Sequence, residues 1–470
     1  MIKNQNKNKL LNKIIIITFW LAIWQLITII IKNPLLLPSP VQALNALLMF
    51  LATKGYYFDV LNTMGRCILG ISFSFITGFA FALLSYRSKY VRMVLSLPVS
   101  LLKSIPVMAI IIYALIILSS NQVAVFVCFL MCFPIVYVNI LSGFDNVNYE
   151  YIEMAKVFSI NKSMVFKHIL FPSVMPQIKA SLNLLSGLSW KAVVSAEVLS
   201  IPDFGMGYNL MNAKYYLETE NLFAWIISIV FFSYMFEQTI KKIINKSEKK
   251  EYIPSKINIK STISGAYSPS GQDIVIRNLN KAFDNNQIFK NFNITFKGNS
   301  RTSIIAPSGY GKTTLLRIIA GLEPFDSGNV ESNKSLNISY LFQEDRLIPW
   351  LNIYDNLALV LAGKLPTKEI DKRIDKILHI MELWDDRFKL PCQLSGGMRH
   401  RVSISRAFIF PADILILDEP FKGLDALLID RIINGAWLRT TKNKTVIFST
   451  HTKEISQKLA DQVIDLTLIV

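Results

Sequence analysis

Long apolar runs in the first half of this 470-residue chain limit its possible folds more than any other feature. About twenty consecutive apolar residues in a helix match the hydrocarbon thickness of a lipid bilayer. Six runs approach that length, and they lie near residues 14–31, 66–86, 101–119, 123–143, 179–199 and 221–240. A chain of this length also suggests at least two domains. We therefore expect an all-α polytopic membrane domain with six transmembrane helices, followed by a domain of another kind.

The positions of lysine and arginine predict how the six spans are oriented. Basic residues crowd the N-terminus, the segment after the second run, residues 145–179 and the segment after the sixth run. Cytoplasmic segments beside a membrane are enriched in Lys and Arg, so both termini are expected in the cytoplasm. The first run is interpreted as a retained signal anchor, because no small-residue cleavage motif follows it. These patterns predict a multi-pass protein of a bacterial cytoplasmic (inner) membrane, in contact with membrane lipid.

The net charge of +17 raises the question of nucleic acid as a partner. The basic residues are accounted for by the segments beside the apolar runs. No interleaved basic and aromatic stripe of the kind that reads nucleic acid is present. We therefore expect no nucleic acid partner.

Two segments define the expected domain boundaries. Residues 150–178 form an inward loop whose helical stretches are too polar to span and too apolar to remain free, which suits docking on a cytoplasmic partner. Residues 241–272 are rich in Lys, Ser, Pro and Gly, which is typical of a linker. We expect a membrane domain at 1–240, a cytoplasmic linker at 241–272 and an α/β domain at 273–470.

A glycine-containing loop near the start of the α/β domain predicts phosphate binding. In the stretch SIIAPSGYGKTTLLRIIAGL (303–322), an apolar strand runs into a glycine loop and then into an amphipathic helix, the context that a P-loop needs. Gly309 and Gly311 would let backbone N–H groups close on phosphate oxygens. Lys312 would reach the β- and γ-phosphates, and the Thr313 hydroxyl would bind magnesium. Ala306 stands where the first glycine of the pattern usually lies.

A pair of acidic residues follows a second apolar strand. The stretch ILILDEP (414–420) ends its buried run at Asp418 and Glu419, and delivers two carboxylates to one edge of the sheet. Asp418 would hold magnesium through water. Glu419 would orient and deprotonate an attacking water, which is work for one positioned carboxylate beside a metal.

The order of motifs in this half resembles that of ABC-type ATPases. LSGGMRHRVSISRAF (394–408) resembles the ABC signature, with His400 where the family usually has Gln. Gly423-Leu424-Asp425 looks like the D-loop, and IFSTH ends at a histidine, His451, that would contact the γ-phosphate. Gln343, in YLFQEDRLIPW, matches the Q-loop glutamine. The resemblance implies ATP and Mg²⁺ as cofactors.

The resemblance also assigns roles to individual residues. The catalytic residues would be Glu419, His451 and Gln343. Magnesium would be held by Thr313, Gln343 and Asp418. The nucleotide would contact Ser308, Gly309, Tyr310, Gly311, Lys312, Thr313, Thr314, Ser395, Gly396, Gly397 and Asp425, with Phe283 stacked on adenine.

The inward loop of the membrane half resembles the EAA loop of type I ABC importers. Glu153, Ala155, Ile169 and Pro172 match its pattern, whereas Ser159 replaces the usual glycine. In the resemblance, Glu153, Ala155, Ser159 and Pro172 couple the membrane domain to the ATPase. The stretches 36–47 and 189–210, and the Pro349-Trp350 pair, look like the branch that imports nitrate, sulfonates or taurine.

The expected function is ATP-driven import of a small solute, either of that branch or a small vitamin precursor, by a fused permease and ATPase. The resemblance implies a homodimer, because each nucleotide site would use one subunit's P-loop and the facing subunit's signature, and an extracytoplasmic solute-binding protein. An ABC exporter and a membrane-anchored regulatory ATPase remain alternatives. Lys191 and Glu197, inside the fifth expected span, would either reach an interface or contact the solute.

Overall fold

The computed structural model describes residues 2–251, 269–284, 286–332 and 337–468, with side chains from residue 15 onward except at 247–251 and 332. The chain forms two compact units. The first unit is Met1–Val147 with Ser173–Glu248, and the second is Asn148–Pro172 with Lys249–Val470. The predicted docking loop therefore belongs largely to the same unit as the α/β domain.

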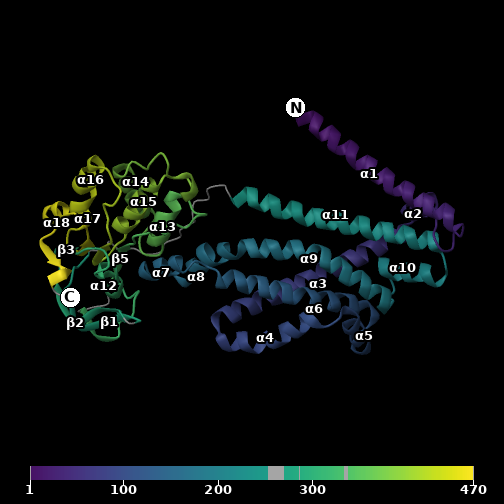
Figure 1. Cartoon of the computed structure of the whole chain (residues 1–470), viewed down its shortest axis with the longest axis horizontal. Coiled ribbons are helices and arrows are strands. Elements are labelled where there is room, and N and C mark those ends of the chain that lie inside the picture. Colours follow the sequence, from purple (N-terminus) through teal and green to yellow (C-terminus); the bar gives the residue numbers. More distant parts are fainter. Residues whose placement is uncertain (1, 252–268, 285, 333–336, 469–470) are drawn as a thin grey trace. The chain divides into compact units, whose positions relative to one another are not determined.

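Helices make up the described part of the first unit (Figure 1). Their bounds are α1 Ile2–Ile31, α2 Pro40–Leu51, α3 Lys54–Arg87, α4 Lys89–Ser104, α5 Val107–Ile117, α6 Ser120–Asp145, α9 Phe171–Ser200, α10 Met206–Tyr215 and α11 Thr219–Glu251.

Small residues bring α3 and α6 close together. A Cβ atom added at Gly70 would lie 2.5 Å from Cys128 Sγ, and one added at Gly78 would lie 2.7 Å from Val136 Cγ1. Glycine at both positions lets the α3 backbone approach the side chains of α6 closely. Small residues have this role in many helix pairs that associate in lipid. The α3–α6 pair forms the centre of this unit.

Three described helices are long and apolar enough to cross a membrane: α3, α6 and α11. The helices α4 and α5 pass the same test only as a pair, and they bend by 106° at their break. Ile105 is extended there and Pro106 follows it, because a proline disfavours helical backbone in the residue before it. The predicted span at 101–119 is therefore wrong as one straight helix.

The other predicted elements differ in detail from the structure. The described apolar part of α1, Ile15–Ile31, is shorter than the three long spans, and α9, which contains 179–199, is not among them. Both stay predictions as spans. The linker predicted at 241–272 begins as helix, because α11 continues to Glu251. Residues 252–268 of that predicted linker lie outside the described residues.

A buried ion pair fixes α9 against α3. Glu197 is fully buried, and its Oε1 atom lies 2.6 Å from Nη1 of Arg66. The same carboxylate accepts hydrogen bonds from the Thr63 hydroxyl, at 2.9 Å, and from the backbone N–H of Gly207 at the start of α10, at 3.0 Å. Glu197 therefore joins three helices, whereas Lys191 is exposed.

The second unit contains two sheets and the helices around them. The antiparallel sheet has the order β2-β1-β4, with β1 Ile274–Phe283, β2 Asn286–Phe296 and β4 Ser327–Ser332. The parallel sheet has the order β5-β6-β7-β3-β8, with β3 Arg301–Ile305, β5 Ile338–Leu341, β6 Ile414–Leu417, β7 Thr445–Ser449 and β8 Gln462–Asp465.

Three helices of this unit precede its strands along the chain, and the others lie between or after the strands. They are α7 Tyr149–Val157, α8 Lys162–Val165, η1 Phe166–Leu170, α12 Lys312–Ile319, α13 Ile353–Leu361, α14 Thr367–Ile380, η2 Pro391–Gln393, α15 Gly396–Ile409, α16 Ala426–Ile432, η3 Ile433–Trp437, α17 Leu438–Thr440, α18 Lys453–Leu459 and η4 Leu466–Leu468.

The parallel sheet brings the predicted motifs to one edge. Every residue of β6 and β7 is buried, as expected for central strands that are covered on both faces. The strands β6, β7 and β3 are neighbours, so their carboxyl ends meet at the same edge. The carboxyl edge of a parallel sheet is where ligands bind in such folds. Residues that follow Ile305, Leu417 and Ser449 are therefore placed together.

Candidate nucleotide site and docking surface

The loop between β3 and α12 has the backbone of a phosphate cradle. Gly309 and Gly311 have φ angles of 91° and 82°, in the region that favours glycine. A Cβ atom at Gly311 would lie 2.5 Å from Ile288 Cγ2, so the packing also requires glycine there. Lys312 Nζ donates to the carbonyl oxygens of Ala306, at 2.6 Å, and Pro307, at 3.0 Å. Carbonyl oxygens of the loop thus hold the Lys312 ammonium in place. The replacement of the usual glycine by Ala306 does not prevent this contact.

Asp418, directly after β6, is held at the edge of the sheet by β7. Its Oδ1 atom accepts a hydrogen bond from Ser449 Oγ at 2.7 Å, and its Oδ2 atom is buried without a hydrogen-bond partner among the described residues. Burial raises the pKa of this carboxyl above its ordinary value, and the Ser449 hydroxyl lowers it in part. An additional positive charge at Oδ2 would compensate that burial.

Glu419 lies between a histidine and a lysine side chain. Its Oε1 atom is 2.6 Å from His451 Nε2, and its Oε2 atom is 2.9 Å from Lys422 Nζ. Burial raises the pKa of Glu419, but these two partners outweigh it and hold the pKa below the ordinary value. The side chain is therefore a carboxylate at neutral pH.

A cavity of about 300 Å³ lies beside the P-loop. The residues that line it are Phe283, Ile288, Ser308, Gly309, Gly311, Lys312, Thr313, Thr314, Gln343, Glu419 and His451. The predicted P-loop, Q-loop and histidine residues thus meet around one space. Phe283 is half exposed at its rim, with Lys281 Nζ 4.3 Å from its ring centre. Tyr310 does not line the cavity and is exposed.

The predicted magnesium ligands fit the chemistry of that ion. Thr313, Gln343 and Asp418 offer hydroxyl, amide and carboxylate oxygens, the hard ligands that Mg²⁺ prefers. The unpartnered Oδ2 atom of Asp418 is a ready acceptor. No group of three or more His, Cys, Asp or Glu residues forms a metal site elsewhere among the described residues.

The predicted signature and D-loop residues do not line this cavity. Ser395 caps the start of α15, where its hydroxyl accepts from Met398 N at 3.2 Å, and Gly396 and Gly397 are exposed beside it. Asp425 caps α16 in the same way, by accepting from Leu428 N at 3.3 Å. In one chain, these groups therefore lie outside the lining of the P-loop cavity.

His400, the departure in the signature, has neighbours of its own. Its Nε2 atom lies 3.2 Å from the Pro420 carbonyl oxygen, and its Nδ1 atom lies 3.5 Å from Asp345 Oδ1. The histidine thus bridges the segment after Gln343 and the segment after Glu419. Both neighbours flank residues of the cavity.

The docking loop presents a buried glutamate to two arginines. Glu153 of α7 lies 2.6 Å from Arg317 Nη2 and 2.7 Å from Arg346 Nη1, and only 5% of its side chain is exposed. Burial raises the pKa of Glu153, but the arginines outweigh it and hold the pKa below the ordinary value. Arg317 belongs to α12, which begins at Lys312, and Arg346 follows the Q-loop residue Gln343. One carboxylate therefore contacts both phosphate-site segments.

Apolar and backbone contacts complete the docking surface. Phe158 is fully buried, with its ring 5.0 Å from that of Phe410, and Ala155 is also buried. Trp350 Nε1 donates to the His168 carbonyl oxygen at 2.9 Å. The contact therefore extends along the whole loop, from α7 to η1.

The other two predicted coupling residues of the loop are Ser159 and Pro172. Ser159, which replaces the family's glycine, has a φ angle of 46° just after α7, which explains why glycine is usual there. Pro172 lies in the first turn of α9, at the last residue of the segment that belongs to the second unit. The predicted loop, 150–178, thus lies in the second unit as far as Pro172, and its residues 173–178 belong to the first unit.

The sequence interpretation missed the partners of several predicted residues. Arg317, Arg346, Lys422 and Ser449 carry no motif of their own. Their signal was position alone: Arg317 lies five residues after Lys312, Lys422 three after Glu419, and Ser449 two before His451. Such spacings place a side chain near a site only after the strand order is known.

Comparisons with known proteins match both halves of the chain. Residues 70–236 match the model of the binding-protein-dependent transport system inner membrane component family, and residues 289–422 match that of the ABC transporter family. The chain is 36% identical over 204 residues to the sulfate/thiosulfate import ATP-binding protein CysA of Mesostigma viride. It is 36% identical over 204 residues to the spermidine/putrescine import ATP-binding protein PotA of Thermotoga maritima.

These similarities cover parts of the proteins compared. Each alignment covers 41% of this chain, and 58% and 55% of the two relatives' lengths. A solved dimeric structure of a bacterial ABC transporter cassette is 28% identical, with a TM-score of 0.37, over 41% of this chain and 93% of that one. Both family matches lie in one polypeptide: a helical domain similar to the inner membrane component of binding-protein-dependent transport systems is followed by an α/β domain similar to ABC transporter ATPases.

Proposed function

We propose that this chain is half of an importer that uses ATP hydrolysis to move a small solute into the cytoplasm. The observation that carries the proposal is the contact of Glu153 with Arg317 and Arg346. That contact ties a loop of the permease sequence to the helix that follows the P-loop and to the segment after Gln343. A change at the phosphate site would therefore move the loop that continues into α9.

The residues of the cavity suit hydrolysis of a phosphoanhydride. Thr313, Gln343 and Asp418 would hold Mg²⁺, which would neutralise phosphate charge. The backbone around Gly309 and Gly311, together with Lys312, would position the phosphates. Glu419 is a carboxylate 12% exposed and oriented by His451 and Lys422, so it can accept a proton from an attacking water.

The working unit of the proposal is two copies of the chain. Ser395, Gly396, Gly397 and Asp425 lie outside the cavity of their own chain, at exposed helix starts. A second copy related by two-fold symmetry would present the same groups to it and complete both sites. A solute-binding protein on the far side of the membrane would deliver the solute, with both termini and the ATPase in the cytoplasm.

The solute is a finer part of the proposal. The two relatives reported are named for import of sulfate or thiosulfate and of spermidine or putrescine, and they align with the ATPase half only. The nitrate, sulfonate or taurine branch rests on residues 36–47 and 189–210. Part of the second stretch, around Glu197, forms the buried network of the first unit.

The proposal is tested by reconstituting the chain in lipid vesicles with the solute-binding protein encoded beside it. A thermal-shift screen of that binding protein against small anions and polyamines would first identify its ligand. The liganded binding protein should then stimulate ATP hydrolysis and drive uptake toward the ATPase side. Hydrolysis that ignores the binding protein, or solute moved away from the ATPase side, would rule out import.

A further inference from the structure

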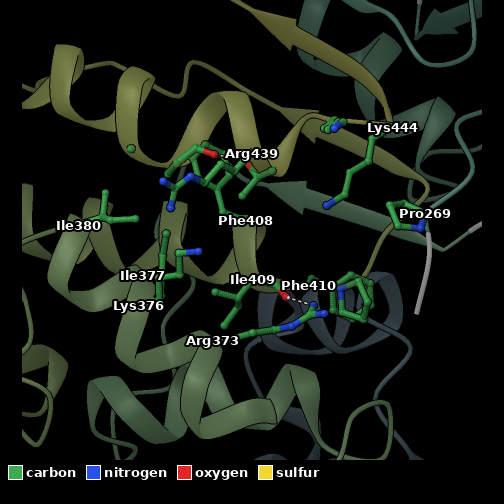
Figure 2. Close-up of a pocket in the computed structure, with 15 residues that line it drawn as sticks. Pro269, Arg373, Lys376, Ile377, Ile380, Phe408, Ile409, Phe410, Arg439 and Lys444 are labelled. Atoms are coloured by element: carbon green, nitrogen blue, oxygen red, sulfur yellow. Dashed lines mark hydrogen bonds between the residues drawn. The ribbon is translucent and has the colours of Figure 1, made fainter. Parts of the chain in front are cut away.

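A second cavity in the ATPase unit shares no residue with the nucleotide cavity. It has a volume of about 260 Å³ (Figure 2). Its walls come from α14, from the end of α15 with Phe410, from η3 and α17, and from the residues before β7. It is independent of the transport proposal, because none of the roles assigned above uses it.

The walls of this pocket are strongly basic. Five of its fifteen lining residues carry positive charge and none carries negative charge: Arg373, Lys376, Arg439, Lys442 and Lys444. Arg373 is paired with Glu369, at 2.9 Å. The other four take part in no ion pair within the part of the chain that the structure describes. Four of the five basic side chains around this small space are therefore outside any described ion pair.

Lys444 is the residue that points to a ligand. Only 7% of its surface is exposed, and its ammonium has no hydrogen bond or ion pair with any described residue. Figure 2 shows its side chain extending from the segment before β7 into the pocket. The nearby Asp413 carboxylate already accepts from the backbone N–H groups of Ser270 and Asn337. An unpaired, buried ammonium is costly unless an anion joins it.

The rest of the lining indicates what kind of anion fits. Ile377, Ile380, Phe408 and Ile409 give the pocket an apolar wall beside the basic groups (Figure 2). A phosphate monoester carries a charge of about −1.5 to −2 near pH 7 and several acceptor oxygens, which matches several unpaired cations better than one carboxylate does. The apolar wall suits the organic part of such an ester.

We propose that this pocket binds a small organic phosphate monoester, with Lys444 and Arg439 on the phosphate and the isoleucines on the organic group. Burial, together with the neighbouring Arg373, lowers the pKa of Lys444 to about 8. A bound dianion would stabilise the ammonium form and raise the pKa of Lys444 back toward its ordinary value.

The test uses the full-length chain in detergent and phenyl phosphate as the probe. A non-hydrolysable ATP analogue with Mg²⁺ is kept saturating, so that the nucleotide cavity does not contribute. Isothermal titration should detect one saturable site per chain. Lys444→Met and Arg439→Ala should each weaken binding about tenfold or more, because each removes a charge-assisted hydrogen bond. Lys444→Arg should retain binding.

Matched controls decide the outcome. Lys372→Met removes a charge from the exposed face of the same helix, α14, and should leave phenyl phosphate binding unchanged. Arg439 is exposed, so its variant tests the pocket even if Lys444→Met perturbs folding. Absence of saturable binding, or equal affinity in wild type and both pocket variants, would overturn the proposal. Equal affinity for inorganic phosphate would overturn the assignment to an ester.

Discussion

At the scale of single residues, Glu419 combines backbone strain with a fixed charge. Its φ angle of 52° is uncommon for a residue with a side chain, and such strain is often kept at functional sites. The strained backbone follows β6 directly, and its N–H donates to Ser449 Oγ at 3.0 Å. The same serine hydroxyl donates to Asp418. One residue of β7 thus bonds both to the carboxylate of Asp418 and to the backbone of Glu419.

Replacing Glu419 with Gln should reduce ATP hydrolysis by about a hundredfold or more, because an amide cannot accept a proton from water. Binding of ATP should persist, since the P-loop is unchanged. Steady-state hydrolysis and nucleotide binding of the purified chain are the measurements, with the exposed Glu454→Gln as control. Hydrolysis near the wild-type rate would remove Glu419 from the role of base.

Lys444 gives a prediction about stability and pH. Its pKa is lowered from 10.5 to about 8 by burial and by Arg373, so the unfolded chain holds this proton more tightly than the folded chain does. Lys444 therefore lowers the free energy of unfolding by about 3 kcal/mol at most. This destabilisation is fully present below pH 8, and it disappears as the pH rises past 10.5.

Lys444→Met should therefore raise the melting temperature of the ligand-free chain at pH 7, and raise it less at pH 10. Thermal unfolding of the full chain at both pH values measures this, with Lys372→Met as the matched control. A variant less stable than wild type at pH 7 would show that Lys444 is stabilised by a group that the structure does not place beside it.

Many site residues could be predicted from sequence, and their partners could not. Glycines and carboxylates at the ends of apolar strands have a local signature, because strand, loop and helix follow one another in the chain. The pairing of Glu153 with Arg317 joins residues 164 positions apart, and nothing in the local pattern specifies it. Tyr310 shows the converse: it lies within the motif, but its side chain is exposed outside the cavity.

At the scale of elements, α7 acts through a buried charge. Its neighbours in the second unit include β5, which precedes Gln343 (Figure 1). Lys156 Nζ also donates to the Gly321 carbonyl oxygen, just after α12, at 3.0 Å. Glu153 and Lys156 lie about one helical turn apart and contact Arg317 in the last turn of α12 and Gly321 just after it. Because α7 is bonded to α12 at two points, we expect a displacement of α12 to move α7 as a rigid element.

Neutralising Glu153 should destabilise the docking of α7 strongly. Loss of one partner of a buried ion pair costs about 3–5 kcal/mol, because the remaining charges stay desolvated. In a double-mutant cycle, Glu153→Gln with Arg317→Gln should cost clearly less than the sum of the single variants. Thermal unfolding measures the cycle, and Glu150→Gln on the same helix is the control. Strict additivity would mean that the pair contributes no coupling.

The same pair has a defined pH dependence. The pKa of Glu153 is lower in the folded chain than in the unfolded chain, so its stabilisation is complete above the unfolded value of about 4.5. It is lost as the pH falls below that value through the folded pKa. Wild type should therefore lose more stability than Glu153→Gln between pH 5 and lower pH, as followed by thermal unfolding.

The elements predicted best are those with a strong period or a strong apolar run. The helices α3, α6 and α11 contain the predicted runs, although each extends beyond them. The break at Pro106 was visible in the sequence only as a proline near the start of a run. Its angle depends on how α4 and α5 pack, which hydropathy does not encode. The helical start of the linker was missed because its charges obscured the apolar period.

At the scale of the whole molecule, the residues predicted for the nucleotide site fall into two groups. The cavity collects the P-loop, Gln343, Glu419 and His451, whereas Ser395 lies at the exposed start of α15. Two chains would supply one another's missing groups. Hydrolysis should therefore depend on both members of a pair.

A mixing experiment tests this dependence. Lys312→Ala and Ser395→Arg should each abolish hydrolysis when present in every chain. In mixed dimers, one site receives both changes and the other receives neither, so part of the activity should return. Separate affinity tags allow mixed dimers to be purified and assayed. A fully active detergent-solubilised monomer, or mixed dimers without any activity, would contradict independent shared sites.

The fusion itself was predictable because each half has its own unmistakable pattern, apolar runs in one and ordered nucleotide motifs in the other. The solute was not predictable for a physical reason. Its contacts depend on side chains that converge from several helices, and the pattern along α9 indicates burial without saying which groups meet. Glu197 illustrates this, since its partner Arg66 lies 131 residues away.

The placement of residues 148–172 in the ATPase unit changes what the docking contact must achieve. In a transporter made from separate chains, such a contact must hold two subunits together against dilution. Here both surfaces belong to one polypeptide, so the contact forms within one molecule and does not weaken on dilution. Binding that would be too weak for independent subunits is enough. A Glu153 variant with a weakened contact should therefore keep its ATPase domain on purification but move less solute per ATP hydrolysed. Rates of hydrolysis and of transport, measured on the same vesicles, would reveal this.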